Sequence, residues 1–138
     1  MAELQPLCDM DSLRLQSART DKLIVFCFTA SWCGPCKIIK GKIQGEKLKV
    51  DFSRVEFFEI DVDSCGELST KCAIREMPTF QTRKLVGEES VLEKQLLGAD
   101  IKKLEELITS GIEEVRKNKV RADFWDATQK IKTLTAFP

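Results

Sequence analysis

Histidine is absent from the 138 residues of this chain, and no other feature of its composition excludes as much. Without an imidazole the protein has no Ser-His-Asp triad, no histidine general base and no histidine-ligated metal. Its chemistry must use thiols, carboxylates or the backbone. Lys plus Arg and Asp plus Glu number 22 each, so the formal net charge is zero and does not indicate a nucleic acid as a partner.

Long apolar runs are missing too. The longest nearly unbroken run, 23–30, is far short of the roughly 20 residues that span a bilayer, so no membrane association is expected. Glu3 and Asp9 precede the first basic residue, which is unlike a secretory signal. We therefore expect a cytoplasmic protein. Glycine and proline are too few for a low-complexity chain, and 43% apolar residues is typical of a globular one.

The six cysteines first suggest a disulfide framework. They are Cys8, Cys27, Cys33, Cys36, Cys65 and Cys72. A chain of this size in a reducing compartment needs no such framework, so we expect most of them to be free thiols and any disulfide to be a working one. A structural zinc site is rejected, because Cys65 and Cys72 are separated by six residues instead of the two typical of a zinc knuckle. Nothing in the sequence assigns a role to Cys8.

Apolar runs and helical patterns alternate along the chain. Strands are predicted within 1–10 and at 23–28, 55–62, 77–81 and 91–97, the last two joined by a hairpin through Gly87. Helices are predicted at 11–20, from Pro35 through Ile43, at 67–73, and after Asp100 as N-cap with Ile101, Leu104, Leu107 and Ile108 on one face. Because 23–28 is apolar on both faces, we expect a central strand with helices on either side. This order predicts an α/β layer fold with a mixed sheet.

A further helix follows Gly111, which is expected to interrupt the one before it. Its apolar residues recur at spacings of four and three: Val120, Phe124, Ala127, Ile131 and Leu134. We therefore divide the chain into a domain at 1–108 and a C-terminal amphipathic extension at 109–138. The extension either packs on its own domain or binds a partner.

The most informative feature is Cys33-Gly34-Pro35-Cys36, at a junction between a strand and a helix. Unpaired N–H groups and the helix dipole at such a position stabilise a thiolate, which is the form that attacks a disulfide. The second cysteine, one turn further in, is placed to attack the resulting mixed disulfide. Cys33 is therefore predicted to be the nucleophile and Cys36 the resolving thiol.

Four segments in this order resemble thioredoxins. They are Phe-Thr-Ala-Ser-Trp-Cys-Gly-Pro-Cys-Lys at 28–37, Asp61-Val62-Asp63, Met77-Pro78-Thr79-Phe80 and Gly98-Ala99. The resemblance covers roughly 12–108. It implies a thioredoxin fold, with a four- or five-stranded mixed sheet between helices, to which this chain adds a C-terminal helix. It also implies reduction of protein disulfides without a cofactor, with electrons supplied by a thioredoxin reductase.

The resemblance also carries over site residues. Trp32 matches the tryptophan beside the active cysteines, and Pro78 matches the cis-proline that faces the disulfide. With these, Gly34, Pro35, Met77 and Gly98 are expected to form the substrate groove. Cys65 and Cys72 match extra cysteines of animal thioredoxins, where they can form a second, regulatory disulfide, which makes them candidate regulatory thiols.

The chain departs from thioredoxins at several positions. Cys27 replaces a buried acid that is thought to exchange a proton with the resolving thiol, which puts efficient turnover in question. Gly41 replaces a helix-kinking proline, the interval from Pro78 to Gly98 is about four residues longer than usual, and 81–83 is unusually polar. With the extra helix, these differences suggest an alternative function. In it the protein is a thioredoxin-type subunit docked in a large assembly, as in axonemal dynein light chains, with a cytoskeletal location and secondary redox activity.

Overall fold

A five-stranded sheet in the order β1-β3-β2-β4-β5 forms the centre of the protein. The computed structural model describes residues 2–135, with side chains as far as Ile131. The strands are β1 (Leu4–Pro6), β2 (Leu23–Thr29), β3 (Val55–Asp61), β4 (Thr79–Val86) and β5 (Glu89–Leu97). The first three run parallel to one another, whereas β4 is antiparallel to both β2 and β5. The predicted mixed sheet is thus confirmed.

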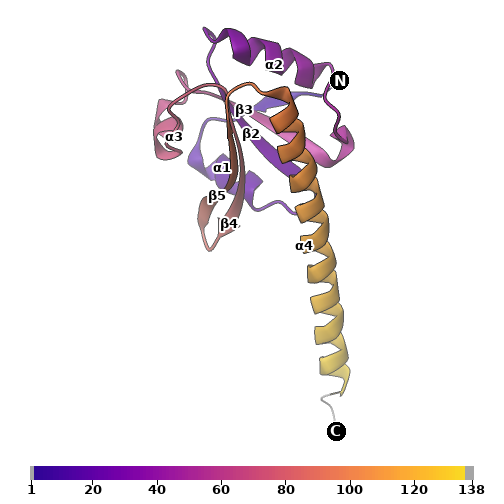
Figure 1. Cartoon of the computed structure of the whole chain (residues 1–138). Helices are drawn as coiled ribbons and strands as arrows, with labels where there is room; N and C mark the ends of the chain where they lie inside the picture. The colour runs from indigo at the N-terminus through magenta and orange to yellow at the C-terminus, as the bar shows by residue number, and fades with distance from the viewer. Residues whose placement is uncertain (1, 136–138) are drawn as a thin grey trace.

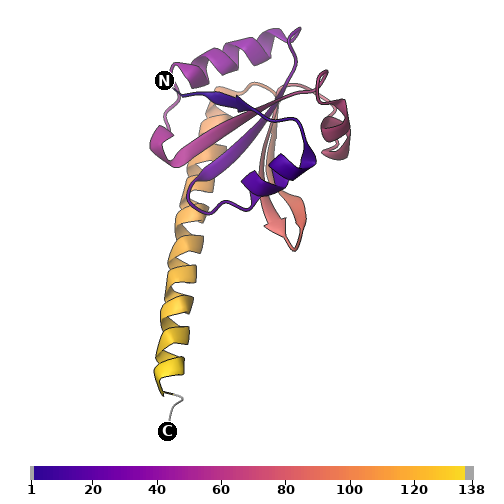
Figure 2. The same cartoon turned by 180° about the vertical axis from the view of Figure 1, so that it is seen from behind.

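Helices cover both faces of this sheet, as Figures 1 and 2 show from opposite sides. They are α1 (Met10–Ser17), α2 (Gly34–Gln44), α3 (Gly66–Lys71) and α4 (Ile101–Thr135), with a short 3-10 helix at Phe52–Arg54. Alternate residues of β2 enter two separate cores. Val25 and Cys27 pack with α2 and α4, whereas Phe26 and Phe28 pack with α1 and α3. The central strand predicted from its two apolar faces is therefore confirmed.

The β4–β5 hairpin is long, and its polar residues are largely internal. Gln81 and Thr82 are buried, and Gln81 Nε2 donates to Gln95 Oε1 at 2.7 Å. Arg83 Nη1 donates to Gln81 Oε1 at 2.6 Å, and Arg83 Nε donates to Ser90 Oγ at 2.8 Å. Hydrogen bonds from Gln81 and Arg83 to residues of β5 thus account for much of the unusual polarity of 81–83. Their hydrogen bonds are made within the hairpin, which satisfies buried polar groups.

The predicted break at Gly111 is wrong, because α4 is one continuous helix of 35 residues. It begins as expected, with Asp100 Oδ1 accepting from the Lys103 N–H at 3.1 Å. Gly111 is buried where α4 crosses β2, and a Cβ there would lie 2.7 Å from Leu23 Cδ1. The glycine therefore allows close packing of the helix on the strand.

Two alanine substitutions compare Gly111, which is buried, with Gly41, which is exposed. Gly111→Ala should lower the free energy of unfolding by ~1–3 kcal/mol, since the new methyl group overlaps Leu23. Gly41→Ala should raise it by about 0.5–1 kcal/mol, because nothing lies within 4 Å of a Cβ there and alanine favours the helix. Urea unfolding of both variants measures the difference. A Gly111→Ala variant as stable as the wild type would contradict the packing role.

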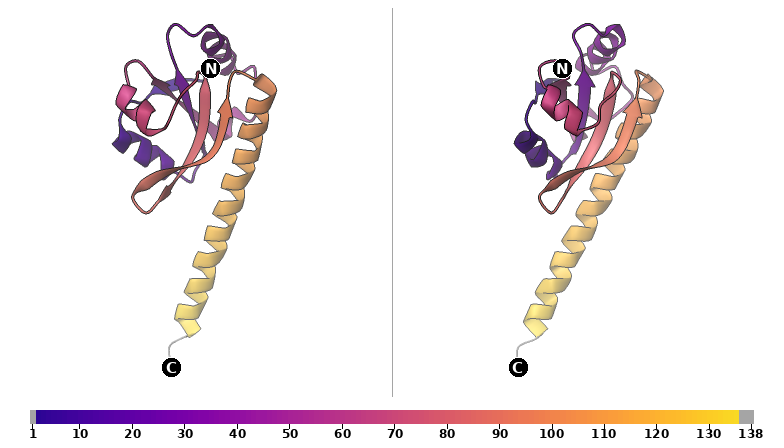
Figure 3. Two further views of the ribbon diagram at one scale, coloured as in Figure 1. Left: turned by 60° about the vertical axis from the view of Figure 1, so that its left-hand side comes forward. Right: turned by 90° about the vertical axis from the view of Figure 1, so that its left-hand side faces the viewer.

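The last part of α4 leaves the domain. The contacts of α4 with the core end at Val115, and residues 116–127 are all exposed. In Figure 3 this part of the helix extends well past the sheet and the hairpin. The interpretation that the extension packs on its own domain therefore holds for Ile112 and Val115 but not for 116–127, and the side chain of Leu134 lies outside the described ones. Among the helices of residues 2–135, none combines the length and apolarity that a membrane crossing needs.

Candidate active site

The active-site segment lies where β2 ends and α2 begins. Cys33 is the N-cap of α2, and Pro35 occupies its first turn, where a missing N–H breaks no hydrogen bond. The Cys36 N–H donates to Cys33 Sγ at 3.2 Å. This N–H and the positive end of the helix dipole stabilise negative charge on Cys33 when the bond is open.

Cys33 and Cys36 form a disulfide, with their Cα atoms 5.3 Å apart. Both residues are buried against Ala30, Val62 and Met77. Because Gly34 and Pro35 between them are exposed, the disulfide lies just beneath the surface.

The Met77–Pro78 peptide bond is cis, as the resemblance implies. The Met77 carbonyl oxygen lies 3.8 Å from Cys33 Sγ, and the Pro78 carbonyl accepts from the Gly98 N–H at 2.9 Å. Gly98 has φ +93°, a conformation that favours glycine. The structure thus brings Met77, Pro78 and Gly98 together on one side of the disulfide.

Trp32 is 66% exposed, and its ring is oriented by a hydrogen bond. Its Nε1 donates to Asp63 Oδ2 at 3.0 Å. Asp63 is in turn placed by Asp61, whose Oδ1 accepts from the Asp63 N–H at 2.9 Å. Sequence reasoning used these two acids to recognise the family and missed their role in holding Trp32. Their position at and just after the end of a buried strand was the available signal.

Cys27 lies in the core below the disulfide and is 4% exposed. Burial raises the pKa of Cys27 far above its ordinary value, and the negative charge of Glu59 adds to the effect. The thiol is therefore neutral at physiological pH and accepts no proton. That Cys27 is a poor substitute for a buried acid stays a prediction.

A carboxylate does lie nearby, on the neighbouring strand. Glu59 pairs with Cys27 across β2 and β3. Its Oε2 is buried and forms an ion pair with Lys40 Nζ at 2.8 Å. Cys27, Cys36, Lys40 and Glu59 all line one cavity of about 10 Å³, roughly the space that one water needs.

The model of the thioredoxin family matches residues 11–110. The chain belongs to the thioredoxin family. Rabbit (Oryctolagus cuniculus) thioredoxin is 45% identical over 87 residues, covering 61% of this chain and 81% of the rabbit protein. Human thioredoxin is 44% identical over 90 residues, covering 63% and 84%.

Solved structures of thioredoxins share this fold. Trypanosoma brucei brucei thioredoxin superposes with a TM-score of 0.66 at 26% identity, over 80% of this chain and 92% of the other. The Schistosoma mansoni thioredoxin pre-protein gives 0.61 at 35% identity, over 80% and 99%. With the bonded Cys33–Cys36 pair, membership makes this thioredoxin a thiol-disulfide oxidoreductase.

This thioredoxin has a second disulfide that sequence reasoning missed. Cys8, after β1, is bonded to Cys65, the N-cap of α3. Cys72 and Cys27 are the free cysteines, and burial raises the pKa of Cys72. The expectation that most cysteines are free thiols is therefore wrong, and Cys65 pairs with Cys8 instead of Cys72. Within residues 2–135 no three metal-ligating side chains are grouped to hold an ion.

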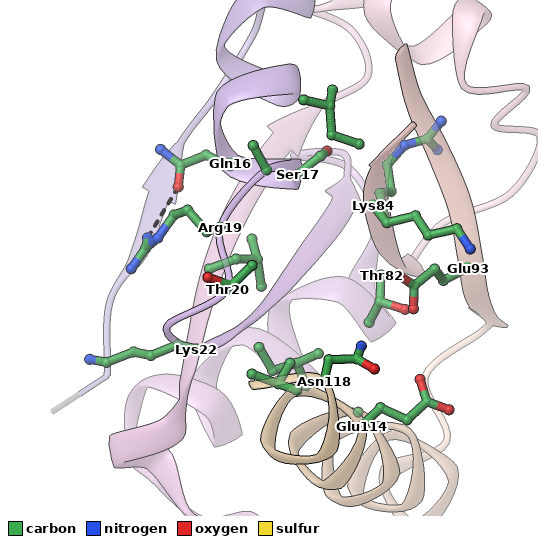
Figure 4. Close-up of a pocket in the computed structure, with 17 residues that line it drawn as sticks. Gln16, Ser17, Arg19, Thr20, Lys22, Thr82, Lys84, Glu93, Glu114 and Asn118 are labelled. Atoms are coloured by element: carbon green, nitrogen blue, oxygen red, sulfur yellow. Dashed lines mark hydrogen bonds between the residues drawn. The ribbon is translucent and has the colours of Figure 1, made fainter. Parts of the chain in front are cut away.

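A larger pocket of about 340 Å³ lies at the other end of β2, away from the disulfide. Figure 4 shows it between the end of α1, the hairpin and α4. Its Arg19 is already held, with Nη1 donating to Glu56 Oε2 at 2.6 Å and Nη2 to Asp21 Oδ2 at 2.7 Å. Neither Cys33 nor Cys36 lines this pocket, so it is separate from the redox site.

Proposed function

We propose that this thioredoxin reduces disulfides in other proteins, with Cys33 as nucleophile and Cys36 as resolving thiol. The observation that supports these roles is the hydrogen bond from the Cys36 N–H to Cys33 Sγ at the start of α2. The Cys33 thiolate attacks one sulfur of the substrate, forms a mixed disulfide and releases the other sulfur as a thiolate. Cys36, once deprotonated, attacks Cys33 Sγ and releases the second substrate thiolate.

Each cycle transfers two electrons to the substrate and leaves the Cys33–Cys36 disulfide, the form described above. A thioredoxin reductase is the proposed partner that returns two electrons and so reopens the bond. The reducing supply that this requires supports the cytoplasm as the proposed compartment. The docked-subunit alternative is not favoured, because the relatives reported above are thioredoxins.

The groove beside the disulfide is proposed to hold an extended segment of the substrate. Trp32, Gly34 and Pro35 form its exposed side, and Met77, Pro78 and Gly98 form the other. The Met77 carbonyl oxygen, 3.8 Å from Cys33 Sγ, places this backbone where a substrate chain could pair with it.

Reduction of insulin tests the proposed function. The purified protein, with NADPH and a thioredoxin reductase, should reduce the insulin disulfides and consume NADPH catalytically. The same assay is repeated with dithiothreitol in place of the reductase. A protein that is active only with dithiothreitol passes electrons to insulin but does not accept them from the reductase. No acceleration over the background in either assay, from a folded protein, would contradict protein-disulfide reduction.

Glu59 is proposed to receive the Cys36 proton through the small cavity, in place of the missing acid. Its buried oxygen and the shared lining with Cys36 support this path. Cys27→Asp should then raise turnover about three- to tenfold at neutral pH, since it adds a second carboxylate beside Cys36, whereas Cys27→Asn should not. Glu59→Gln should slow the wild type but not Cys27→Asp. Rates across pH measure the effect, and a Glu59→Gln variant as fast as the wild type would contradict the path.

A regulatory role is proposed for Cys65 through its bond with Cys8. Cys65 is two residues from Asp63, which holds Trp32, so the state of this bond is linked to the substrate surface. Cys72, also a candidate regulatory thiol, is buried with a raised pKa, which makes its thiolate scarce. The proposed division into a domain at 1–108 and an extension at 109–138 is supported by the end of the family match at 110.

A further inference from the structure

The exposed part of α4 carries an apolar stripe beyond Val115, the last residue of the helix that packs on the core. Val120, Phe124 and Ile131 are each more than 60% exposed, and Ala127 is exposed between them. Their spacings of four, three and four residues are those of a coiled-coil seam. In Figure 3 this part of the helix runs clear of the sheet.

The stripe lies on a different side of α4 from the one that packs on the sheet. The core-facing side includes Leu104, Ile108 and Val115. At 3.6 residues per turn, Val120 lies about 140° around the helix axis from Val115. The stripe therefore does not continue the packing of the domain, and it faces away from the side of α4 that contacts the core.

We propose that a second copy of this chain covers the stripe, through an antiparallel pairing of two α4 helices about a two-fold axis. In an antiparallel coiled coil, the a positions of one helix face the d positions of the other. Val120 then lies against Ile131 of the second copy, and Phe124 lies against Ala127 of the second copy. The large phenyl ring thus faces the smallest residue of the stripe, which suits close packing.

The charges beside the stripe favour this arrangement. Asp123 and Lys130 both flank the seam, and in the antiparallel pairing each lies opposite the other on the second copy, giving two reciprocal ion pairs. A parallel pairing instead places Arg116 beside Arg121 of the second copy, which is repulsive. The charges therefore attract each other in the antiparallel pairing and repel each other in the parallel one.

The pairing leaves the redox sites free. The disulfide is at the start of α2, which Figure 1 shows at the opposite end of the molecule from the last turns of α4. Two antiparallel helices that overlap only beyond Val115 would hold the two domains apart. Self-association and disulfide reduction are thus separable, and failure of one leaves the other standing.

Sedimentation equilibrium of the full chain over a broad concentration range tests the proposal. The wild type should show a monomer–dimer equilibrium, and a nonreducing gel should show that the dimer is not disulfide-linked. Asp123→Lys and Lys130→Asp should each weaken the dimer at least about tenfold, because each places like charges opposite one another. The combined Asp123→Lys/Lys130→Asp variant should restore it.

Two controls separate the seam from other effects. Trp125→Ala removes an exposed aromatic from a different side of the helix and should leave the dimer unchanged. Circular dichroism should show the same helix content in every variant, and insulin reduction by Asp123→Lys should match the wild type. A monomer at all concentrations would overturn the proposal. So would a dimer that the single charge reversals do not weaken, or that the combined variant does not restore.

Discussion

Cys33→Ser should abolish the reduction of protein disulfides, whereas Cys36→Ser should stop it halfway. Cys33 is the sulfur that the Cys36 N–H and the start of α2 prepare as a thiolate, and a serine hydroxyl cannot replace it. In Cys36→Ser the first attack still occurs, but nothing resolves the mixed disulfide. A substrate should therefore remain bound to Cys33 as a covalent adduct.

Mass spectrometry after mixing with oxidised insulin measures both outcomes. Cys36→Ser should gain the mass of one insulin molecule, which dithiothreitol removes, and Cys33→Ser should gain none. Turnover of both variants should fall by at least about a thousandfold. If Cys33→Ser formed the adduct instead, through Cys36, the assignment of nucleophile and resolving thiol would be reversed.

The fold and the redox pair were readable in the sequence for physical reasons. A strand that is buried on both faces must be apolar throughout, so β2 was visible as a run. Cys33 and Cys36 lie within one segment of four residues, and their geometry follows from the start of a helix. The cis bond before Pro78 is different, since only the resemblance implied it.

What was missed depends on contacts between distant segments. Glycine disfavours a helix, so Gly111 was interpreted as a break, yet packing against Leu23 overrides that preference. Cys8 was uninformative because its partner lies 57 residues away, on another element. An amphipathic pattern in the extension likewise shows an apolar side without showing what covers it.

The Cys8–Cys65 disulfide should have the largest effect on stability of any bond described here. It spans 57 residues, and a loop of that size contributes about 4 kcal/mol to the free energy of unfolding by restricting the unfolded chain. Cys8→Ser should therefore lower stability by about 2–4 kcal/mol in urea without reductant. Because Cys8 is exposed, the substitution itself removes little packing.

A Cys36→Ser background isolates this bond, since it removes the other disulfide. Adding dithiothreitol should then destabilise Cys36→Ser by as much as Cys8→Ser does, and leave the combined Cys8→Ser/Cys36→Ser variant unchanged. Equal stability of Cys36→Ser with and without reductant would show that the bond does not hold the fold. The expected result would instead show that stability depends on the redox state of Cys8 and Cys65. That state would then affect α3 and the adjacent loop, in which Asp63 orients Trp32.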